Sequence, residues 1–273
     1  MLKVFQQARS ALSLLDPGEV RGRAGRSIRL GLVAASPASY EFMEEVLAPE
    51  PPQGGLIFRA SDPDAPREVD LVFYQPELDL GGDAYALDAA DPYAVLARAA
   101  HEHEDLALAL ARQFPGFRRP VVDRLIHTVA RENALFALAT ALPDVIPNLM
   151  ELPWAFGEWA SDTAFITTNQ VRMAFLIAAA CGKDVGFGRQ KLEILTIGAG
   201  AFGWRAIARE LVGKIPLGGG LIPKGAIAYA GTYVLGKGLE RIHAGRAPLN
   251  RIERRAAYRH ALESGKSVVS SLL

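Results

Sequence analysis

The chain has 273 residues, half of them hydrophobic, and its 30 basic residues balance 30 acidic ones. This length is enough for one large domain or two ordinary ones with a substantial core. The zero net charge gives no indication of nucleic-acid binding, and the single cysteine, Cys181, excludes an internal disulfide.

The charges are unevenly distributed along the chain. Residues 36–110 contain sixteen acidic and three basic residues, whereas residues 164–241 contain four acidic and ten basic ones. Opposite signs on two segments indicate either an interface between them or two different partners.

Residues 1–115 are predicted to form an acidic α/β module. Alternating strand and helix signals favour a small, mostly parallel sheet, and Phe114-Pro115-Gly116 is the predicted boundary after it. The expected elements, in chain order, are a helix over 2–15 ended by Pro17-Gly18, a strand over 28–34, a helix from Ser36-Pro37 to Leu47, strands over 56–59 and 69–74, a weaker strand over 84–87, and a long helix from Asp91-Pro92.

Beyond the boundary the strand signals fade, and residues 116–249 are predicted to form an all-helical domain. The fold class is therefore mixed, with a parallel α/β module followed by an all-α domain. Residues 250–273 are predicted to be a basic helix and tail. The segment 119–142 is expected to form one long helix or two, and further helices are expected over 154–166, 169–181, 191–212 and 222–244. The last of these is punctuated by glycines, which allow helices to approach one another closely.

The expected cellular location follows from the absence of long apolar segments. The chain does not begin with the unbroken apolar stretch of a secretory signal. A membrane-spanning helix needs about 20 mostly apolar residues, and the longest charge-free runs, 133–143, 194–204 and 225–236, are much shorter. We therefore expect a cytoplasmic protein, either free or peripheral at the inner face of the cell membrane.

The glycine pattern Gly198-x-Gly200-x-x-Gly203 matches the dinucleotide-binding fingerprint. In that fingerprint the glycines follow a strand and open a helix, and an acid about 20 residues further on binds the ribose. No Asp or Glu occurs between Glu210 and Glu240. We therefore expect a glycine-rich helix contact and no bound cofactor. The alternative is an NAD(P)-dependent oxidoreductase that binds its cofactor through these three glycines.

The first strand–helix junction, residues 30–40, is where a nucleotide-binding module places its phosphate loop. It lacks the Gly-Lys-Ser/Thr core of such loops. The second alternative is a GTP-binding protein with an atypical N-terminal site, which would have to contact the phosphates in an unusual way.

The segment from His101 to Asp105 resembles a metal site in composition only, because its two histidines are two residues apart and point in different directions on a helix. We expect a solvated acidic face there and no metal ligand.

Two sets of polar residues are candidate binding sites. Asn169, Gln170 and Arg205 lie within apolar helical segments, so they are predicted to form either a buried polar network or a small binding site. The basic C-terminal helix supplies a candidate contact for a membrane or an acidic partner, through Arg251, Arg254, Arg255 and Arg259. No catalytic residue is predicted.

Several segments of the C-terminal half carry a family resemblance. They are, in order, Glu132-Asn133-Ala134, Ala141-Leu142-Pro143, Ile146-Pro147, Thr167-Thr168-Asn169-Gln170-Val171-Arg172-Met173, Ile177-Ala178, Gly182, Arg205, the segment 211–216, Ala228-Tyr229-Ala230-Gly231-Thr232 and Gly236-Lys237-Gly238. With them, the region from about Arg119 to Arg246 resembles the YcjF-type domain of unknown function. In bacteria this domain is fused behind a GTPase domain or encoded beside one.

The resemblance implies association with membranes and with GTPase partners, and it implies a helical conformation for residues 198–203. It brings no catalytic residue. The N-terminal half stands where the GTPase domain would, so it resembles a degenerate nucleotide-binding module that lacks both the phosphate loop and an Asn-Lys-x-Asp motif. The sequence thus predicts a non-catalytic adaptor or scaffold, with a GTPase or another protein and an anionic membrane surface as its partners.

Overall fold

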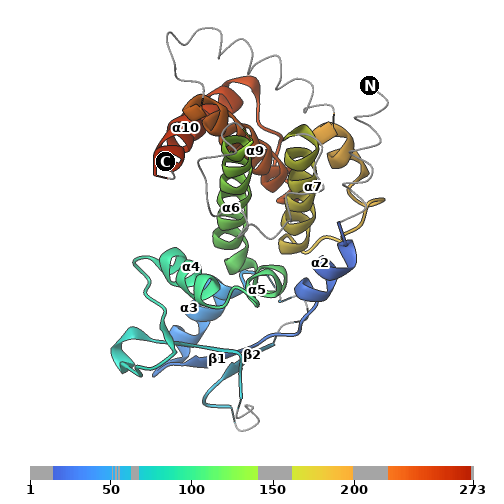
Figure 1. Cartoon of the computed structure of the whole chain (residues 1–273). Coiled ribbons are helices and arrows are strands. Elements are labelled where there is room, and N and C mark those ends of the chain that lie inside the picture. Colours follow the sequence, from blue (N-terminus) through green and yellow to red (C-terminus); the bar gives the residue numbers. More distant parts are fainter. Residues whose placement is uncertain are drawn as a thin grey trace. The chain divides into compact units, whose positions relative to one another are not determined.

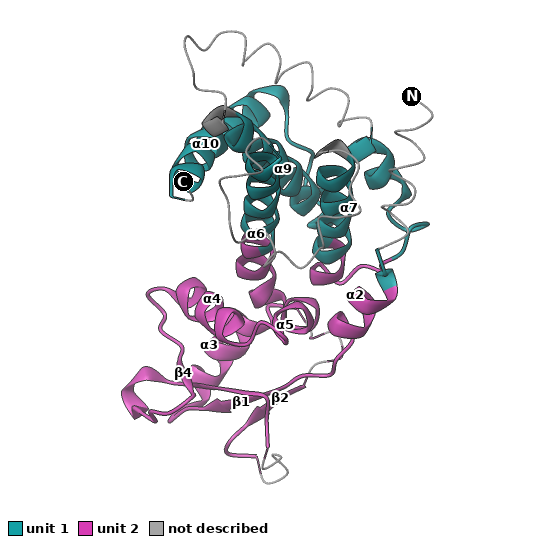
Figure 2. Ribbon diagram, viewed as in Figure 1, with its two compact units in different colours: residues 1–17, 125–177, 186–273 teal, residues 18–124, 178–185 magenta. Residues whose placement is uncertain are grey.

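The structure, a computed structural model, describes residues 15–50, 52, 54, 56–62, 68–140, 162–198 and 221–271. These residues divide into two compact units (Figures 1 and 2). The sheet unit comprises residues 18–124 and 178–185, and the helical unit comprises the described parts of 1–17, 125–177 and 186–273. The predicted fold class is confirmed, because the N-terminal half contains a parallel sheet and the C-terminal half is helical. The predicted helix over 2–15 falls almost entirely outside the described residues.

The sheet unit contains four parallel strands in the order β2-β1-β3-β4. The strands are β1 (Arg29–Val33), β2 (Leu56–Arg59), β3 (Leu71–Tyr74) and β4 (Tyr85–Ala86). The helices are α2 (Pro17–Ala24), α3 (Pro37–Leu47), η1 (Pro76–Leu78), α4 (Pro92–Glu102), α5 (Ala107–Gln113) and η2 (Pro115–Phe117). The register places Leu30 of β1 opposite Ile57 and Leu71. All four predicted strands are thus present, each within two residues of its expected bounds.

Local capping signals set the starts of the helices in this unit. The Ser36 hydroxyl accepts a hydrogen bond from the backbone N–H of Ser39 at 3.2 Å, and Pro37 opens α3 as predicted. Asp91 caps α4 in the same way, accepting from the N–H of Ala94 at 3.0 Å. Pro17 begins helix α2, and the helix that it was predicted to end falls almost entirely outside the described residues. Proline is well suited to the first helical position, which needs no N–H donor.

The predicted long helix from Pro92 is in fact two helices, α4 and α5, separated by a turn at residues 103–106. Acidic side chains of this turn form ion pairs with distant arginines. Glu104 pairs with Arg124, and Asp105 pairs with Arg26 at 3.0 Å. These contacts are tertiary, so the helical periodicity of the sequence does not reveal the break.

Helices α3, α4 and α5 lie on the same side of the sheet (Figure 1). The core between the layers contains the fully buried side chains of Leu30, Leu32 and Phe73 from the strands and of Phe114 and Phe117. The ring of Phe73 meets that of Phe117 edge-on, with 6.1 Å between centroids. The segment 114–117, predicted as a boundary, therefore contributes core residues to the sheet unit. Its glycine, Gly116, is needed for close packing, because a Cβ there would lie 2.1 Å from the carbonyl oxygen of Val46.

The helical unit contains α9 (Leu221–His243), α10 (Arg251–Ser270) and most of α6 (Arg118–Ala139) and α7 (Asp162–Ala180). The start of α6 and the last three residues of α7 belong to the sheet unit. Residues 191–198 form a further helical segment. The two helices predicted over 154–166 and 169–181 are not separate where the structure describes them, since α7 runs through 166–169. Gly182 ends α7 at a positive φ of 73°, which favours glycine.

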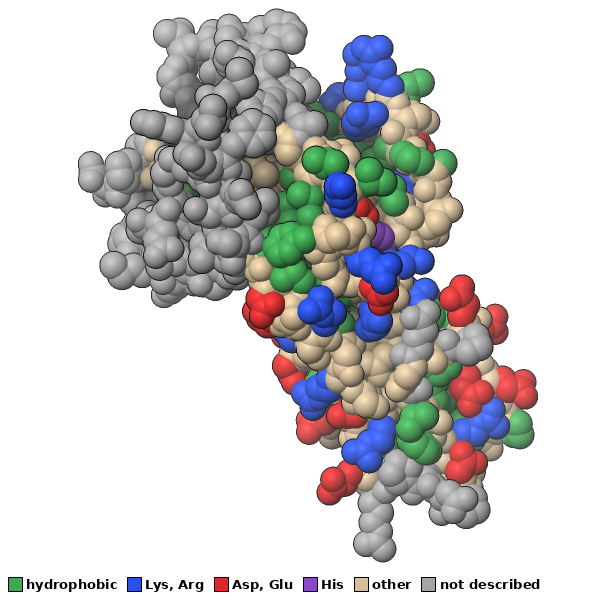
Figure 3. All heavy atoms as spheres, turned by 90° about the vertical axis from the view of Figure 1, so that its right-hand side faces the viewer, with side chains coloured by type: hydrophobic (Ala, Val, Ile, Leu, Met, Phe, Trp, Pro, Cys, Tyr) green, Lys and Arg blue, Asp and Glu red, His purple; other side chains and the backbone are tan. Residues whose placement is uncertain are grey.

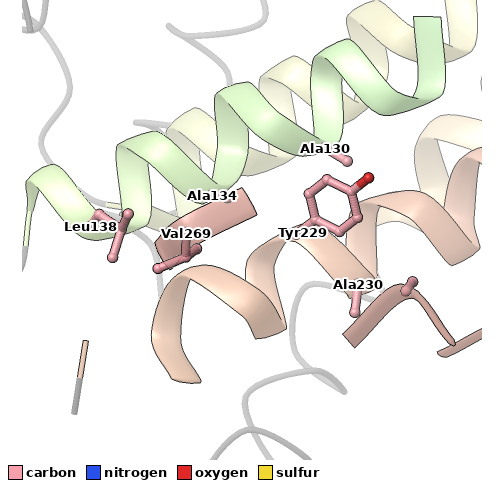
Figure 4. Packing of buried hydrophobic residues seen from close by; sticks show 7 residues of the cluster. Ala130, Ala134, Leu138, Tyr229, Ala230 and Val269 are labelled. Carbon is pink, nitrogen blue, oxygen red and sulfur yellow. The ribbon is translucent and has the colours of Figure 1, made fainter. Parts of the chain in front are cut away.

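Close packing of α6, α9 and α10 forms the core of this unit (Figure 4). The buried cluster comprises Ala130, Ala134 and Leu138 of α6, Tyr229 and Ala230 of α9, and Ala261 and Val269 of α10. A Cβ added at Gly225 would lie 2.7 Å from Val269, and one at Gly236 would lie 2.7 Å from Ile126. These glycines of α9 therefore face protein neighbours, and they let α6 and α10 approach the helix closely.

Candidate functional site

The basic start of α10 is held by two local interactions. The side chain of Asn250 accepts hydrogen bonds from the N–H groups of Ile252 and Glu253, while Glu253 accepts one from the N–H of Asn250, which completes a capping box. Glu253 also accepts a hydrogen bond from Arg241 of α9 at 2.9 Å. The backbone N–H of Asn250 and the Arg241 guanidinium together hold the pKa of Glu253 below its usual value. The single carboxylate in this part of α10 is therefore already engaged.

The four predicted arginines of α10, Arg251, Arg254, Arg255 and Arg259, are all exposed. None of them forms an ion pair within the part of the chain that the structure describes. Ile252 lies among them with 81% of its surface exposed. The first three turns of α10, with an exposed isoleucine and four arginines that form no ion pair with any described acid, thus offer both charge and apolar area to a partner.

Two further helix ends belong to the same region of the helical unit. The last turn of α9 presents Ile242, which is 48% exposed. The segment 191–198 presents Leu192 and Leu195, which are 77% and 59% exposed. It adjoins the end of α9, because Glu193 lies 3.8 Å from His243. On one face of this unit, hydrophobic side chains alternate with Lys and Arg (Figure 3).

We call this region the basic–aliphatic surface and define it by eight exposed residues. They are Leu192, Leu195, Ile242, Arg251, Ile252, Arg254, Arg255 and Arg259. The nearby acids have basic neighbours of their own: Glu240 pairs with Lys237 and Arg246, and Glu193 lies beside His243. The arginines were evident from the sequence. The aliphatic residues were missed, because a large aliphatic residue in a helix is ordinarily buried.

The predicted residues Asn169 and Gln170 lie in a buried polar network between α6, α7 and α9. Asn169 donates to Asn133 Oδ1 and to Glu132 Oε2, both at 2.9 Å. Gln170 donates to the hydroxyl of Thr232 at 3.2 Å, and Asn133 donates to the same hydroxyl at 2.8 Å. These two amides and Thr232 thus tie three helices together.

Arg172 and Glu132 form the more exposed end of the network. Arg172 donates to Asn169 Oδ1 at 2.9 Å and forms an ion pair with Glu132. Both amide atoms of Asn133 and of Asn169, and the amide nitrogen of Gln170, have hydrogen-bond partners among the described residues. Such mutual satisfaction is typical of a network that fixes helix packing. Arg205, the third predicted residue, lies outside the described residues.

The glycine fingerprint does not have the local structure that a dinucleotide site requires. Residues 191–198, which precede and include Gly198, are helical and not a strand. The fingerprint depends on a strand that delivers the glycine turn to the pyrophosphate. Gly200 and Gly203 lie outside the described residues.

A pocket of about 290 Å³ lies beside the N-terminus of α3 in the sheet unit. It is lined by Ala38, Ser39, Phe42, Met43, Gln75, Pro76, Glu77, Leu87, Asp88 and Ala89, all within the described part of the chain and none of them basic. The N–H of Ala35 donates to Gln75 Oε1 at 3.1 Å. This N–H, which could otherwise donate to a phosphate, is therefore already hydrogen-bonded. Two carboxylates in the lining also repel phosphate. These features do not favour a nucleotide at this junction.

The histidines of the acidic segment do not converge on a site. His101 lies 3.5 Å from Glu104, and Asp105 pairs with Arg26. Among the described residues, no three His, Cys, Asp or Glu side chains are grouped as metal ligands would be. In the same part of the chain, no helix combines the length and the apolar character that crossing a bilayer requires.

Comparison with known proteins finds no matching family model, no similar curated protein and no similar solved structure. The functional argument therefore rests on the residues and their geometry.

Proposed function

We propose that this chain is a non-catalytic adaptor whose helical unit attaches to an anionic membrane surface, where a GTPase is a candidate partner. The observation that carries the proposal is the exposure of Arg251, Arg254, Arg255 and Arg259 without an acidic partner among the described residues. The resemblance to the YcjF-type domain adds the GTPase partner and agrees with membrane attachment. The acidic sheet unit is then available to bind a second protein.

Electrostatic attachment of this kind has a predictable strength. A Lys or Arg near an anionic bilayer contributes about 1 kcal/mol, so four arginines contribute roughly 4 kcal/mol, which corresponds to nearly a thousandfold in partitioning. The attraction decays over a Debye length of about 10 Å at 0.1 M salt. Attachment should therefore weaken strongly as the salt concentration rises.

The test is flotation of the purified full chain with phosphatidylserine-containing and with purely phosphatidylcholine vesicles. We expect flotation with the anionic vesicles at low salt, and its loss when the four α10 arginines are changed to Gln. The matched control changes four other exposed basic residues to Gln, so that the net charge falls equally: Arg23, Arg29, Arg131 and Lys183. If the control loses flotation as fully as the α10 variant, the proposal is refuted, because only net charge would then matter.

The alternatives make different predictions. An NAD(P)-dependent oxidoreductase would change nicotinamide fluorescence on titration, and a GTP-binding protein would retain a labelled guanine nucleotide. No observation on the described residues favours either, since a helix precedes the glycine pattern and carboxylates line the pocket of the sheet unit.

A further inference from the structure

The exposed aliphatic residues of the basic–aliphatic surface are not explained by electrostatic attachment. Leu192, Leu195, Ile242 and Ile252 are between 48% and 81% exposed. Large apolar side chains that cluster on a surface mark a contact site more often than chance exposure does. Here they come from three helix segments that are distant in sequence and that the Arg241–Glu253 and Glu193–His243 contacts bring together.

A hydrogen-bonded ion pair and a His–Glu contact join these three segments in the absence of a partner. Arg241 joins the end of α9 to the start of α10, since it donates to Glu253 at 2.9 Å and to the carbonyl of Ala247 at 2.9 Å. Glu193 and His243 join the segment 191–198 to the end of α9. A surface fixed in this way loses little conformational entropy on binding.

The pattern of side chains matches a bilayer interface in both chemistry and arrangement. Arg255 and Arg259 follow Ile252 at three and seven residues along α10, so these two arginines lie on the same face of the helix as the aliphatic side chain. At the surface of an anionic bilayer, the guanidinium groups meet phosphates and carboxylates while the aliphatic side chain enters the acyl region just below. An acidic protein surface would satisfy the arginines, but it would leave the four aliphatic side chains without an apolar partner.

We infer that the basic–aliphatic surface inserts its four aliphatic side chains into the outer acyl layer of an anionic membrane. This inference rests on the proposed function and names the partner as the lipid itself. It also locates the contact. Gly225 and Gly236 of α9 pack against α6 and α10, so the membrane meets the helix ends and not that side of the helix.

The experiment combines flotation with a measurement of the surface pressure of an anionic lipid monolayer. This pressure rises only when side chains enter the monolayer. The test variant replaces the four aliphatic residues by serine: Leu192→Ser, Leu195→Ser, Ile242→Ser and Ile252→Ser. The control variant replaces three exposed leucines of the sheet unit: Leu56→Ser, Leu78→Ser and Leu80→Ser. All these side chains are exposed, so far-ultraviolet circular dichroism should show unchanged folding.

We expect the wild type and the control to raise the monolayer pressure and to retain part of their flotation at high salt. The test variant should still float at low salt, but it should not raise the surface pressure. Its partitioning onto the vesicles at high salt should be at least about tenfold lower than that of the wild type. Several outcomes would overturn the inference: flotation of the wild type without a pressure rise, insertion by the test variant, or equal loss in the control. The first of these leaves the proposed electrostatic attachment intact and indicates a contact of the kind an acidic protein surface would make. Failure of the wild type to float even at low salt would instead refute the proposed function itself.

Discussion

Two glycines of α9, Gly236 and Gly238, lie two residues apart but should respond oppositely to the same substitution. A Cβ at Gly238 would have no neighbour within 4 Å, whereas a Cβ at Gly236 would lie 2.7 Å from Cγ1 and 2.9 Å from Cγ2 of Ile126. Alanine stabilises a helix interior by about 0.5–1 kcal/mol relative to glycine. Gly238→Ala should therefore raise the free energy of unfolding by about that amount.

The same gain applies to Gly236→Ala, but there the new methyl group clashes with a fully buried, β-branched side chain. Overpacking of this kind costs about 1–3 kcal/mol. Because the helix-propensity term is common to both variants, their difference in unfolding free energy isolates the clash at about 1–3 kcal/mol, with Gly236→Ala the less stable.

Urea denaturation followed by circular dichroism measures both variants, since the helical content is high. A double-mutant cycle adds Ile126→Ala, which removes the atoms that the new methyl group meets. The loss caused by Ile126→Ala should be smaller by 1 kcal/mol or more in the Gly236→Ala background. Equal stabilities for Gly236→Ala and Gly238→Ala, or strict additivity in the cycle, would show that α6 and α9 are not packed through this glycine.

Three other substitutions test separate parts of the structure. Asn169→Ala should lower the unfolding free energy by about 1–3 kcal/mol, because it leaves buried partners unsatisfied. The neighbouring Thr168→Val should be neutral or stabilising, since no described group bonds the buried Thr168 hydroxyl. Equal losses of unfolding free energy in urea titrations of the two variants would contradict both expectations. Glu44 accepts hydrogen bonds from Arg59, which lower the pKa of Glu44. The stability from this pair should be present above the ordinary carboxyl pKa and lost as the pH falls through the lowered pKa of the folded state, a change worth less than about 1 kcal/mol. Glu44→Gln should remove this pH-dependent change from a plot of the unfolding midpoint against pH. A plot that the substitution leaves unchanged would argue against the pair. Asn250→Ala should destabilise α10 by about 1 kcal/mol, measured as faster amide exchange in its first turn than in the wild type, and unchanged exchange would mean that the cap is dispensable.

Features with local signals were predictable from the sequence. The β1–α3 junction follows from an apolar run and Ser36-Pro37, and the start of α10 follows from Asn250 and the arginines after it. In both cases the deciding contacts lie within a few residues. The polar character of Asn169 and Gln170 was evident in the same way, because amides are unusual in an apolar helix.

The partners of these groups depend on long-range packing and were not predictable. Nothing local indicates that Asn169 bonds Glu132 and Asn133, or that Gln170 bonds Thr232. The exposure of aliphatic residues is likewise set by which helix ends lie at the surface. The glycine pattern at 198–203 shows the converse problem, since the glycine spacing is the same whether a strand or a helix precedes it.

The sheet unit is not built from one continuous stretch of chain, because residues 178–185 belong to it along with 18–124. Arg21 donates to the carbonyl of Val185 at 2.8 Å, and Arg112 donates to that of Lys183 at 2.9 Å. During vectorial synthesis these carbonyl groups leave the ribosome several seconds after residue 124, at elongation rates of about 5–20 residues per second. The sheet unit therefore stays unfinished while residues 125–177 of the helical unit are being made. A gene cut after residue 124 would encode a fragment of the sheet unit that lacks its closing segment.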